Sequence, residues 1–487
     1  MNPLWTLLPP LAVIPFIIYF GEGRKNLREA SIIIAGLVLL LLNSRIYSDV
    51  TAGIPVESGE LAMLADFSLK LSAEPMGVIF GLLASFLWVV TTVYSIGYMR
   101  GHHEINQTRF YVCFALALAA VMGAAYADNL LTLFVAYEVI TISTFPLVTH
   151  AGGDDARKAG RLYLGILMST SIGFLLPAII WVAAAAGTLD FVPGGVLADS
   201  GLSKGALAVM MALFVFGIAK AGIMPFHRWL PAAMVAPTPV SALLHAVAVV
   251  KTGVFSVLKI VTYTFGIDTV SISGAAYWLL PVAGFTVLAA SIVAFTKDNL
   301  KARLAYSTIS QLSYIIMAAL LATVMSVSGG VLHIVMHAFG KITLFFCAGA
   351  IMVALHKTEI SKMDGIGRRM PLTMGAFFIG ALSIIGLPPA GGAWSKLMIA
   401  GGSLDSGTLI WIGVLMLSTL LNIAYLLPIP LRAFFKPDPD LAPGETATWQ
   451  EAPYACLWAI ALTATTCVVL FLFPRPLTEL IGLIQWR

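Results

Sequence analysis

Residues 128–149 read DNLLTLFVAYEVITISTFPLVT, a stretch that carries one acidic side chain, Glu138, about ten residues from either end. The hydrocarbon core of a bilayer is about 30 Å thick, and an α-helix needs about 20 apolar residues to cross it. The stretch therefore predicts a transmembrane helix with an ionisable group near its middle. No other acidic residue lies so deep in an apolar run, since Asp128 falls at the membrane edge.

The composition of the whole chain agrees with this stretch. Hydrophobic residues make up 59% of the 487 residues, charged residues make up 11%, and the mean hydropathy is +0.93. A soluble domain carries about 25% charged residues, so the composition predicts an all-α polytopic membrane protein. The four cysteines are far apart and match neither a disulfide framework nor a metal-ligand spacing, which disfavours a redox enzyme with its own metal or flavin. The formal net charge of +4 is too small to indicate a nucleic-acid partner.

A window of about 20 residues divides the chain into fourteen transmembrane helices. Every linker between them is too short to be a soluble domain, and an even number of helices puts both termini on one side of the membrane. We expect the spans near residues 3–20, 30–48, 77–98, 109–126, 128–149, 162–187, 205–226, 235–264, 275–296, 303–323, 328–355, 371–400, 407–433 and 453–473.

The distribution of basic residues predicts the orientation. The first apolar run has no basic residues before it and no small-residue cleavage site after it, so we interpret it as a retained helix and not as a signal peptide. The cluster Arg24, Lys25 and Arg28 places residues 21–30 in the cytoplasm. Of the 28 Lys and Arg, 18 fall in loops on that side, five on the opposite side and five within spans. We therefore expect both termini on the outer side of a bacterial cytoplasmic membrane.

An internal repeat is indicated by two pairs of short matches. Asp128-Asn129-Leu130 returns 170 residues later as Asp298-Asn299-Leu300, and residues 222–225 resemble residues 386–389. Two units of five helices, spans 4–8 and 9–13, would lie upside down relative to each other because five is odd. Inverted repeats with Pro/Gly-interrupted helices are typical of secondary transporters, with the ion site near the midplane. The alternative is chance similarity between two apolar stretches.

The repeat divides the chain into four parts. We expect an N-terminal three-helix segment at 1–108, a first repeat at 109–265, a second, inverted repeat at 275–434, and a C-terminal helix and tail at 453–487. The backbone groups that proline leaves unpaired require a hydrated interior, although such prolines also occur as kinks between packed helices. Helix breaks are expected at Pro225, Pro237, Pro388 and Pro389.

Ionisable side chains inside the spans are the candidate functional residues, because burying such a group in hydrocarbon costs several kcal/mol unless it is paired or hydrated. In span 11 three of them repeat every four residues, which places them on one helical face about 6 Å apart. The candidates are Glu138 in span 5, Lys220 in span 7, His245 and Lys251 in span 8, His333, His337 and Lys341 in span 11, and Lys396 in span 12.

The imbalance of charge predicts what these residues do. Four deep lysines face one deep glutamate, so ion pairs cannot neutralise them all. Burial without a partner favours the neutral amine of a lysine, and histidine exchanges protons near pH 7 without any tuning. The set therefore predicts a lateral proton path through the membrane. In this path Glu138 pairs with Lys220 in one state and releases it in another, which drives a proton toward Lys251.

Each candidate also has a structural interpretation. Glu138 and Lys220 would form a static ion pair that joins two helices, the other three lysines would snorkel to an interface, and the histidines would be packing residues. Lys259, eight residues past Lys251, is expected to snorkel and is left out of the path. The histidines of span 11 lack the intervening Glu of a zinc hydrolase, and haem ligation would need histidines on facing helices.

Residues 129–138 resemble a hallmark of the antiporter-like subunits of respiratory complex I and of the Mrp-type cation/proton antiporters. So do residues 220–233, KAGIMPFHRWLPAA, and residues 236–245, APTPVSALLH. The resemblance covers essentially the whole chain. In that family the acid of span 5 and the lysine of span 7 are paired, and protons pass along spans 8, 11 and 12. Carried over, these roles fall on Glu138, Lys220, Lys251, Lys341 and Lys396, with His245, His333 and His337 as relays.

Within the family, the chain looks most like the D-type Mrp subunit. It lacks the long lateral helix of the largest complex I member, and it has Lys396 where another complex I member has a glutamate. The resemblance implies a proton-translocating subunit of a multi-subunit Na⁺/proton antiporter, with other membrane subunits as partners and no cofactor. A Na⁺ site would need clustered carboxylates and carbonyls, so we expect Na⁺ to cross largely in the partner subunits.

Two other hypotheses remain open. The chain would instead be a proton-pumping membrane subunit of a redox-driven complex, either an NADH-quinone oxidoreductase or a membrane-bound hydrogenase. Co-purification with iron–sulfur or flavin subunits would distinguish that assembly from an antiporter. The third hypothesis is a structural membrane scaffold, for which four deep and under-paired lysines would be costly without any benefit.

Overall fold

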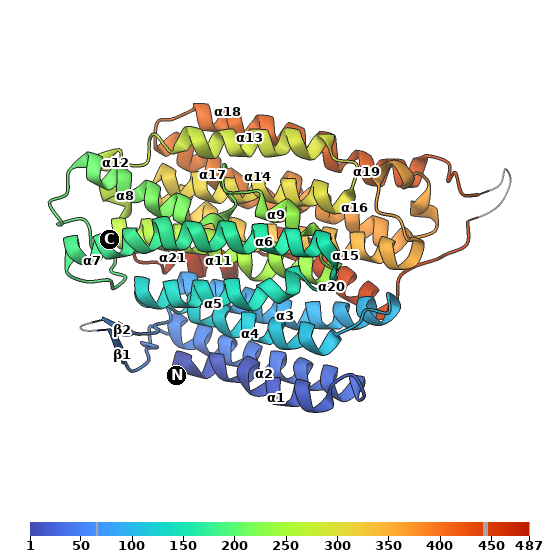
Figure 1. Cartoon of the computed structure of the whole chain (residues 1–487). Coiled ribbons are helices and arrows are strands. Elements are labelled where there is room, and N and C mark those ends of the chain that lie inside the picture. Colours follow the sequence, from blue (N-terminus) through green and yellow to red (C-terminus); the bar gives the residue numbers. More distant parts are fainter. Residues whose placement is uncertain (65–66, 442–446, 487) are drawn as a thin grey trace.

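The computed structural model describes residues 1–64, 67–441 and 447–486, and within them every side chain except those of residues 64, 67 and 245. Long helices lie side by side along one direction and form a single bundle (Figure 1). Both termini lie at the same end of this bundle, which we call the terminal end (Figure 1). The amino group of Met1 pairs there with Asp49 across 3.1 Å.

The N-terminal part forms one edge of the bundle. A turn of 3-10 helix, η1 (Pro3–Leu7), leads into α1 (Leu8–Phe20), which is followed by α2 (Lys25–Thr51) and α3 (Pro75–Gly101). A short antiparallel hairpin, β1 (Leu61–Leu64) and β2 (Phe67–Leu69), joins α2 to α3 at the terminal end (Figure 1). The sequence gives no strong strand pattern here, and we had not predicted the hairpin.

The middle of the chain begins with regular helices and continues with interrupted ones. Its regular helices are α4 (Gln107–Ala125), α5 (Leu130–Val148) and α6 (Gly153–Thr170), which continues through a π-helical turn, η2 (Ser171–Leu175), into α7 (Leu176–Ala186). The interrupted part consists of α8 (Lys204–Gly217), η3 (Ala219–Ala221), α9 (Trp229–Ala232), η4 (Ala233–Val235), α10 (Thr238–Ala242), η5 (Leu243–Val247), α11 (Val249–Lys259), η6 (Ile260–Phe265) and α12 (Ile267–Ser273).

The C-terminal part contains the most deeply buried helices and a second interrupted one. It comprises α13 (Leu280–Thr296), α14 (Leu300–Leu321), α15 (Val324–Leu355), η7 (Ile360–Lys362), η8 (Ile366–Arg368), α16 (Pro371–Ile385), α17 (Gly392–Asp405), α18 (Ile410–Leu426), α19 (Pro428–Phe435), α20 (Tyr454–Leu472) and α21 (Arg475–Gly482). Helix α15 packs against α14, α16, α17 and α20 and is central to the fold.

Ten helices of the described chain are long and apolar enough to cross a membrane, or eleven if the pair bent at Gly266 is one span. Three shorter apolar helices, α8, α13 and α16, lie where we predicted spans 7, 9 and 12. The structure is therefore a helical polytopic membrane fold, as predicted. The exact number of fourteen spans stays a prediction, because spans 7 and 12 are each built from short pieces.

The four prolines at which we predicted helix breaks all lie between helical segments of the structure. Pro225 lies between η3 and α9, and Pro388 and Pro389 lie between α16 and α17. Pro237 lies between η4 and α10, where it is the N-cap of α10 near the start of span 8. A proline in the first turn disturbs little, since the first N–H groups of a helix have no intrahelical partner in any case. Two π-helical segments, η5 and η6, also interrupt the regular helix of span 8.

The two Asp-Asn-Leu motifs adopt the same local structure. Asn129 caps α5 by accepting a hydrogen bond from Thr132 N, and Asn299 caps α14 by accepting one from Ala302 N. Each motif also forms an isolated bridge to a later loop, Asn129 with Asp190 and Asn299 with Glu359. The matching caps and bridges are what two copies of one unit would show.

Candidate functional site

Lys220 lies in the interrupted span 7, where the chain between α8 and α9 leaves the helical path. Its side chain is fully buried, and its Nζ donates hydrogen bonds to Tyr137 O (2.6 Å) and to Thr141 Oγ1 (2.5 Å) of α5. The same Nζ lies 3.1 Å from the centroid of the Tyr137 ring. Neutral oxygens and a ring face therefore hold the amine.

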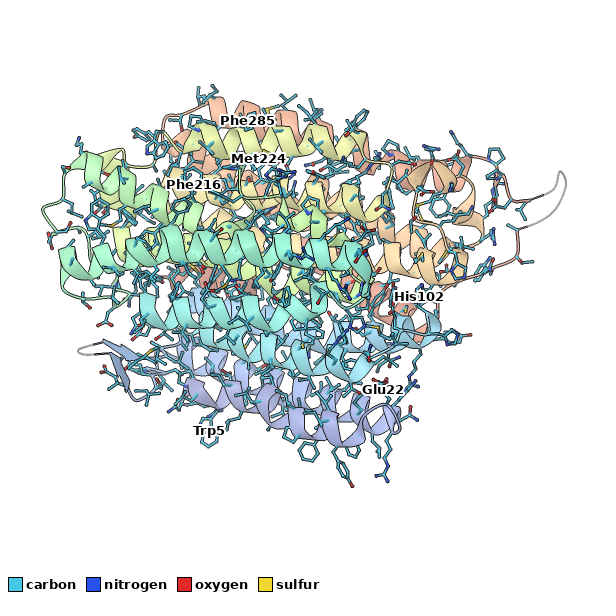
Figure 2. The ribbon with its side chains drawn as sticks, viewed as in Figure 1. Trp5, Glu22, His102, Phe216, Met224 and Phe285 are labelled. Carbon is cyan, nitrogen blue, oxygen red and sulfur yellow. The ribbon has the colours of Figure 1, made fainter. Side chains whose placement is uncertain are left out.

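The interruption is stabilised by side chains from elsewhere in the bundle. Trp229 Nε1 donates to Ala219 O (3.0 Å), which provides a partner for a carbonyl that the break frees. Met224, labelled in Figure 2, donates its N–H to Thr286 Oγ1 of α13 (3.3 Å). The break is thus a fixed structure with paired backbone groups.

Glu138 is not ion-paired with Lys220. Both of its carboxylate oxygens are buried, and neither has a hydrogen-bond partner among the described residues. The amine of Lys220 is held instead by the carbonyl of Tyr137 and the hydroxyl of Thr141, which lie on either side of Glu138 in the sequence. The structure thus shows the pair in an open arrangement, and the static ion pair considered from the sequence is absent.

Lys251 on α11 meets His337 on α15. Its Nζ lies 2.6 Å from His337 Nδ1, and both residues are buried. The helix α11 approaches the break of span 7 closely, since a Cβ added to Gly253 would lie 2.4 Å from Ala221 N and 2.9 Å from Lys220 Cβ. Only glycine permits this contact, which brings the backbone of the Lys251 turn against the Lys220 turn.

The three polar residues of α15 lie along one helix, as the four-residue spacing predicted. The rings of His333 and His337 are 5.9 Å apart between centroids. His333 Nδ1 lies 2.8 Å from Ser395 Oγ of α17, and its Nε2 lies 3.2 Å from Gln311 Oε1 of α14. Gln311 Oε1 can only accept, so His333 joins α14 to α17 by two hydrogen bonds when its Nε2 carries the proton and its Nδ1 accepts from Ser395 Oγ.

The remaining two lysines contact neutral groups as well. Lys341 is fully buried and donates to Ser307 Oγ (2.6 Å) and to Leu304 O (3.2 Å) on α14. Lys396 is partly buried, donates to Ile385 O (2.9 Å), and lies 4.8 Å from the centroid of the Tyr314 ring. The Ile385 carbonyl belongs to the last turn of α16, so the break of span 12 supplies the acceptor.

These proton-exchanging groups lie on elements that pack against one another in turn, from α5 through the break of span 7, α11 and α15 to α17, and so form a row across the bundle. We call it the polar row, and it consists of Glu138, Lys220, Lys251, His337, His333 and Lys396. Lys341 lies beside it, one turn after His337 on α15. The structure therefore brings together seven of the eight residues predicted from the sequence, while the side chain of the eighth, His245, lies outside the described part of the structure.

The neutral polar groups between the lysines were not predicted from the sequence. These groups are Tyr137, Thr141, Ser307, Gln311, Tyr314 and Ser395. Such residues are common in apolar helices, where their hydroxyls usually bond to the carbonyl four residues earlier. The spacing of Tyr137 and Thr141, one turn apart next to Glu138, is the one sequence signal that could have identified this pair.

The prediction that Lys259 snorkels was wrong. Its side chain is 1% exposed, and its Nζ lies 3.1 Å from Glu74 Oε1 at the start of α3. Snorkelling requires that the charged head reaches water, and here a carboxylate from another helix meets it first. The sequence could not show this pairing, because 185 residues separate the two partners.

The described residues contain no group of three or more His, Cys, Asp or Glu arranged to hold a metal ion. The four cysteines are buried and unbonded to one another. The side chains of this site can exchange protons between amines, imidazoles and a carboxylate. None of these steps needs a group beyond the side chains and water.

Comparison with known proteins identifies the family of this chain from its sequence. The family model "NADH:quinone oxidoreductase/Mrp antiporter, TM" matches residues 127–422. The chain is 30% identical over 418 residues to NADH-quinone oxidoreductase subunit N of Desulforudis audaxviator, covering 84% of this chain and 82% of that protein. It is 29% identical over 433 residues to NAD(P)H-quinone oxidoreductase chain 5 of Synechocystis sp., covering 81% of this chain but only 60% of that longer protein.

Two solved structures share the fold over nearly the whole chain. A chain of the membrane-bound sulfane sulfur reductase, an archaeal respiratory membrane complex, gives a TM-score of 0.86 at 24% identity. A chain of the Mrp complex from Dietzia sp. DQ12-45-1b gives a TM-score of 0.83 at 20% identity. Each comparison covers 99% of this chain and 96% of the other chain.

Proposed function

Since the chain belongs to the NADH:quinone oxidoreductase/Mrp antiporter family of transmembrane proteins, we propose that it is the proton-translocating subunit of a multi-subunit Na⁺/proton antiporter. The observation that carries this proposal is the polar row. It joins ionisable groups of four helices and one helix break across the interior of the bundle, where an ionisable side chain is expensive to keep unless it has a function.

The contacts of Lys220 suggest how a proton moves along the row. Its amine is held by two neutral oxygens, so it can exist with or without its third proton. When Glu138 pairs with Lys220, the carboxylate favours the ammonium. When the two are unpaired, as in this structure, the ammonium has less of that support. The proton then moves toward Lys251, His337, His333 and finally Lys396, and each hop restores a neutral amine or imidazole behind it.

The architecture that we propose is fourteen spans in four parts, at 1–108, 109–265, 275–434 and 453–487. The matching caps and bridges of the two Asp-Asn-Leu motifs support two related units. The first motif lies beside Lys70 near the hairpin, and the second lies beside Ser361 of η7, at the other end of the bundle (Figure 1). Opposite ends are what an inverted repeat requires.

We place the terminal end on the outer side of a bacterial cytoplasmic membrane. The basic loops of the opposite end support this orientation. That end can be found in Figure 2 by the labels of Glu22 and His102. We propose that the other membrane subunits of the antiporter are the partners of this chain, and that Na⁺ crosses largely in them.

The second candidate function is a proton-pumping subunit of a redox-driven complex, in which case the chain would be part of a translocating oxidoreductase. The names of its two curated relatives and its likeness to a chain of a respiratory sulfur reductase favour this candidate. The polar row would serve both assemblies, because only the source of energy differs.

Purification from the native membrane tests which assembly is correct. The chain is extracted gently, and its companions are identified by mass spectrometry. Small membrane subunits without cofactors would support the antiporter, whereas companions with iron–sulfur or flavin groups would contradict it and support the redox-driven pump.

Proton transport by the assembled complex tests the polar row itself. Glu138→Ala and Lys220→Ala should each abolish transport in reconstituted vesicles while the complex still assembles. Asp155→Ala and Lys158→Ala, which remove the same charges from exposed positions of α6, are the matched controls and should transport normally. Full activity of both interior variants would contradict the proposal.

A further inference from the structure

A cavity of about 540 Å³ opens at the terminal end, and the polar row does not include it. The segment after α2, the loop before α3, the end of α11 and the C-terminal residues surround this space. Its lining includes Glu57, Glu74, Asp128, Phe191, Lys259 and Gln485. Three carboxylates and a lysine therefore share one cavity at the end of a transmembrane helix, where ionisable groups meet water.

Glu74 is the carboxylate that connects this cavity with the interior. It is 21% exposed on the cavity side, and on the other side its Oε1 meets the buried Nζ of Lys259. Its Oε2 accepts hydrogen bonds from Tyr263 OH (2.8 Å) and from Met76 N (3.1 Å). The residue is thus held in place by three partners while part of it remains accessible to water.

Lys259 lies on the same helix as Lys251 of the polar row. The two are eight residues apart on α11, or about 12 Å along the axis. Phe255 lies halfway between them, 5.6 Å from Lys259 Nζ to its ring centroid, and it packs against Phe80 at 4.9 Å between centroids. An aromatic barrier one turn thick therefore separates the cavity lysine from the row.

Resting on the proposed function, we propose that this cavity is the proton-exchange site between the polar row and the aqueous phase at the terminal end. Glu74 and Lys259 are its two proton-carrying groups, and Phe255 is the barrier that they work across. By the orientation proposed above, the site faces the outside of the cell.

The transfer balances without any further reagent. A proton from water in the cavity adds to the Glu74 carboxylate, which becomes a carboxylic acid and ends the ion pair. The Lys259 ammonium, now without its counterion, gives a proton through water to the neutral amine of Lys251. The Glu74 acid then returns a proton to the Lys259 amine, which restores the ion pair, so one proton has moved from the cavity to Lys251. The reverse order carries a proton out.

The first test compares two carboxylates of the same cavity in the purified complex, reconstituted in vesicles. Glu74→Gln keeps the shape and the acceptor that caps α3 but cannot carry a proton, and we expect it to lower proton flux at least tenfold. Glu57→Gln removes an exposed carboxylate for which no ion pair with Lys259 is found, and we expect it to keep the wild-type rate. A Glu74→Gln rate within twofold of the wild-type rate would overturn the inference.

A second test blocks the cavity and leaves the ion pair intact. Gln485→Cys places a thiol on the exposed part of the lining, and a charged, membrane-impermeant methanethiosulfonate reagent added at the terminal end should reduce flux at least fivefold. Asp199→Cys, exposed in a loop at the same end, is the labelled control and should be unaffected, and the native cysteines are buried. Unchanged flux in labelled Gln485→Cys would overturn the inference even if Glu74→Gln is inactive.

Lys220→Ala in the same vesicles separates this inference from the proposed function. If Lys220→Ala still transports, the polar row is not the path and the proposed function fails. If Lys220→Ala is inactive while Glu74→Gln and labelled Gln485→Cys transport normally, only the exchange site fails.

Discussion

Lys220 and Lys259 are both buried lysines with a glutamate close in the fold, yet only Lys259 forms an ion pair. Glu74 lies at the N-cap of α3, where a free backbone N–H and a tyrosine hydroxyl fix its carboxylate toward Lys259. Glu138 lies in the middle of α5, where every backbone N–H is already used by the helix. Position within a helix thus decides whether a glutamate is fixed or free to turn.

The difference has a chemical consequence. The ion pair stabilises the ammonium form of Lys259 until the Glu74 carboxylate is protonated. The neutral oxygens around Lys220 can contact its amine in either protonation state. A paired lysine suits a site that responds to the aqueous phase, and an unpaired one suits a relay. Three predictions test this comparison, and a fourth compares the carboxyl groups of the two Asp-Asn-Leu motifs.

The largest effect is expected at Lys220. Lys220→Arg keeps the positive charge, but an arginine does not give up its proton in proteins, so proton flux should fall about a hundredfold or more, the range attributed to positioned proton-transfer groups. The measurement is proton uptake by vesicles that contain the assembled complex. Lys158→Arg on the exposed face of α6 is the control, and a transporting Lys220→Arg variant would refute the relay role of this amine.

Replacing each glutamate by glutamine should change stability in opposite directions. Glu74→Gln removes the partner of a buried ammonium, which costs about 3 kcal/mol or less, since Glu74 is 21% exposed and water replaces part of the interaction. Glu138→Gln changes a buried carboxyl group whose oxygens have no hydrogen-bond partner among the described residues, so the melting temperature of the variant should be equal to or above that of the wild type. Thermal unfolding of the purified complexes that carry each variant measures the two melting temperatures. An equal decrease of the melting temperature in both variants would contradict the comparison.

A smaller effect is expected at Thr141, which accepts a hydrogen bond from Lys220. Hydrogen bonds to charged groups contribute about 1.5–3 kcal/mol, so Thr141→Val should change the proton affinity of Lys220 and slow flux about tenfold. Thr144→Val is the matched control one turn later on α5, where the hydroxyl contacts Tyr163 and no lysine. Similar rates in the two variants would show that the hydroxyl does not tune the relay.

The smallest effect concerns the two Asp-Asn-Leu motifs. Burial raises the pKa of the Asp128 carboxyl, against the effect of Lys70, whereas hydrogen bonds from Ser361 lower the pKa of Asp298. Because the folded-state pKa of Asp298 is depressed, its contribution to stability is complete above its ordinary value and is lost as the pH falls through the lower, folded-state pKa.

Ser361→Ala should therefore move this loss of stability to higher pH. The measurement is the melting temperature between about pH 3 and pH 5, compared with Thr358→Ala in the same loop as the control. An unchanged pH profile would show that the Ser361 hydroxyl does not determine the Asp298 titration.

Much of the site was predictable because it depends on local sequence. A charged residue in an apolar run is visible without a structure, so Glu138 and the four lysines of the path stood out at once. The four-residue spacing in α15 was equally clear, since it follows from helix geometry. Lys259 was misjudged because its role depends on what lies beside it in the fold, a carboxylate from a distant part of the chain.

The sequence by itself determined the membrane class, the positions of the helices and the identity of most candidate proton carriers, because hydropathy and helical period are properties of neighbouring residues. Only the tertiary structure decided which partners these carriers have. Lys251 meets His337, Lys220 meets Tyr137 and Thr141, and Lys259 meets Glu74, all across more than 75 residues of chain. Such contacts are set by the way helices pack against one another, and a single sequence carries no direct record of that packing.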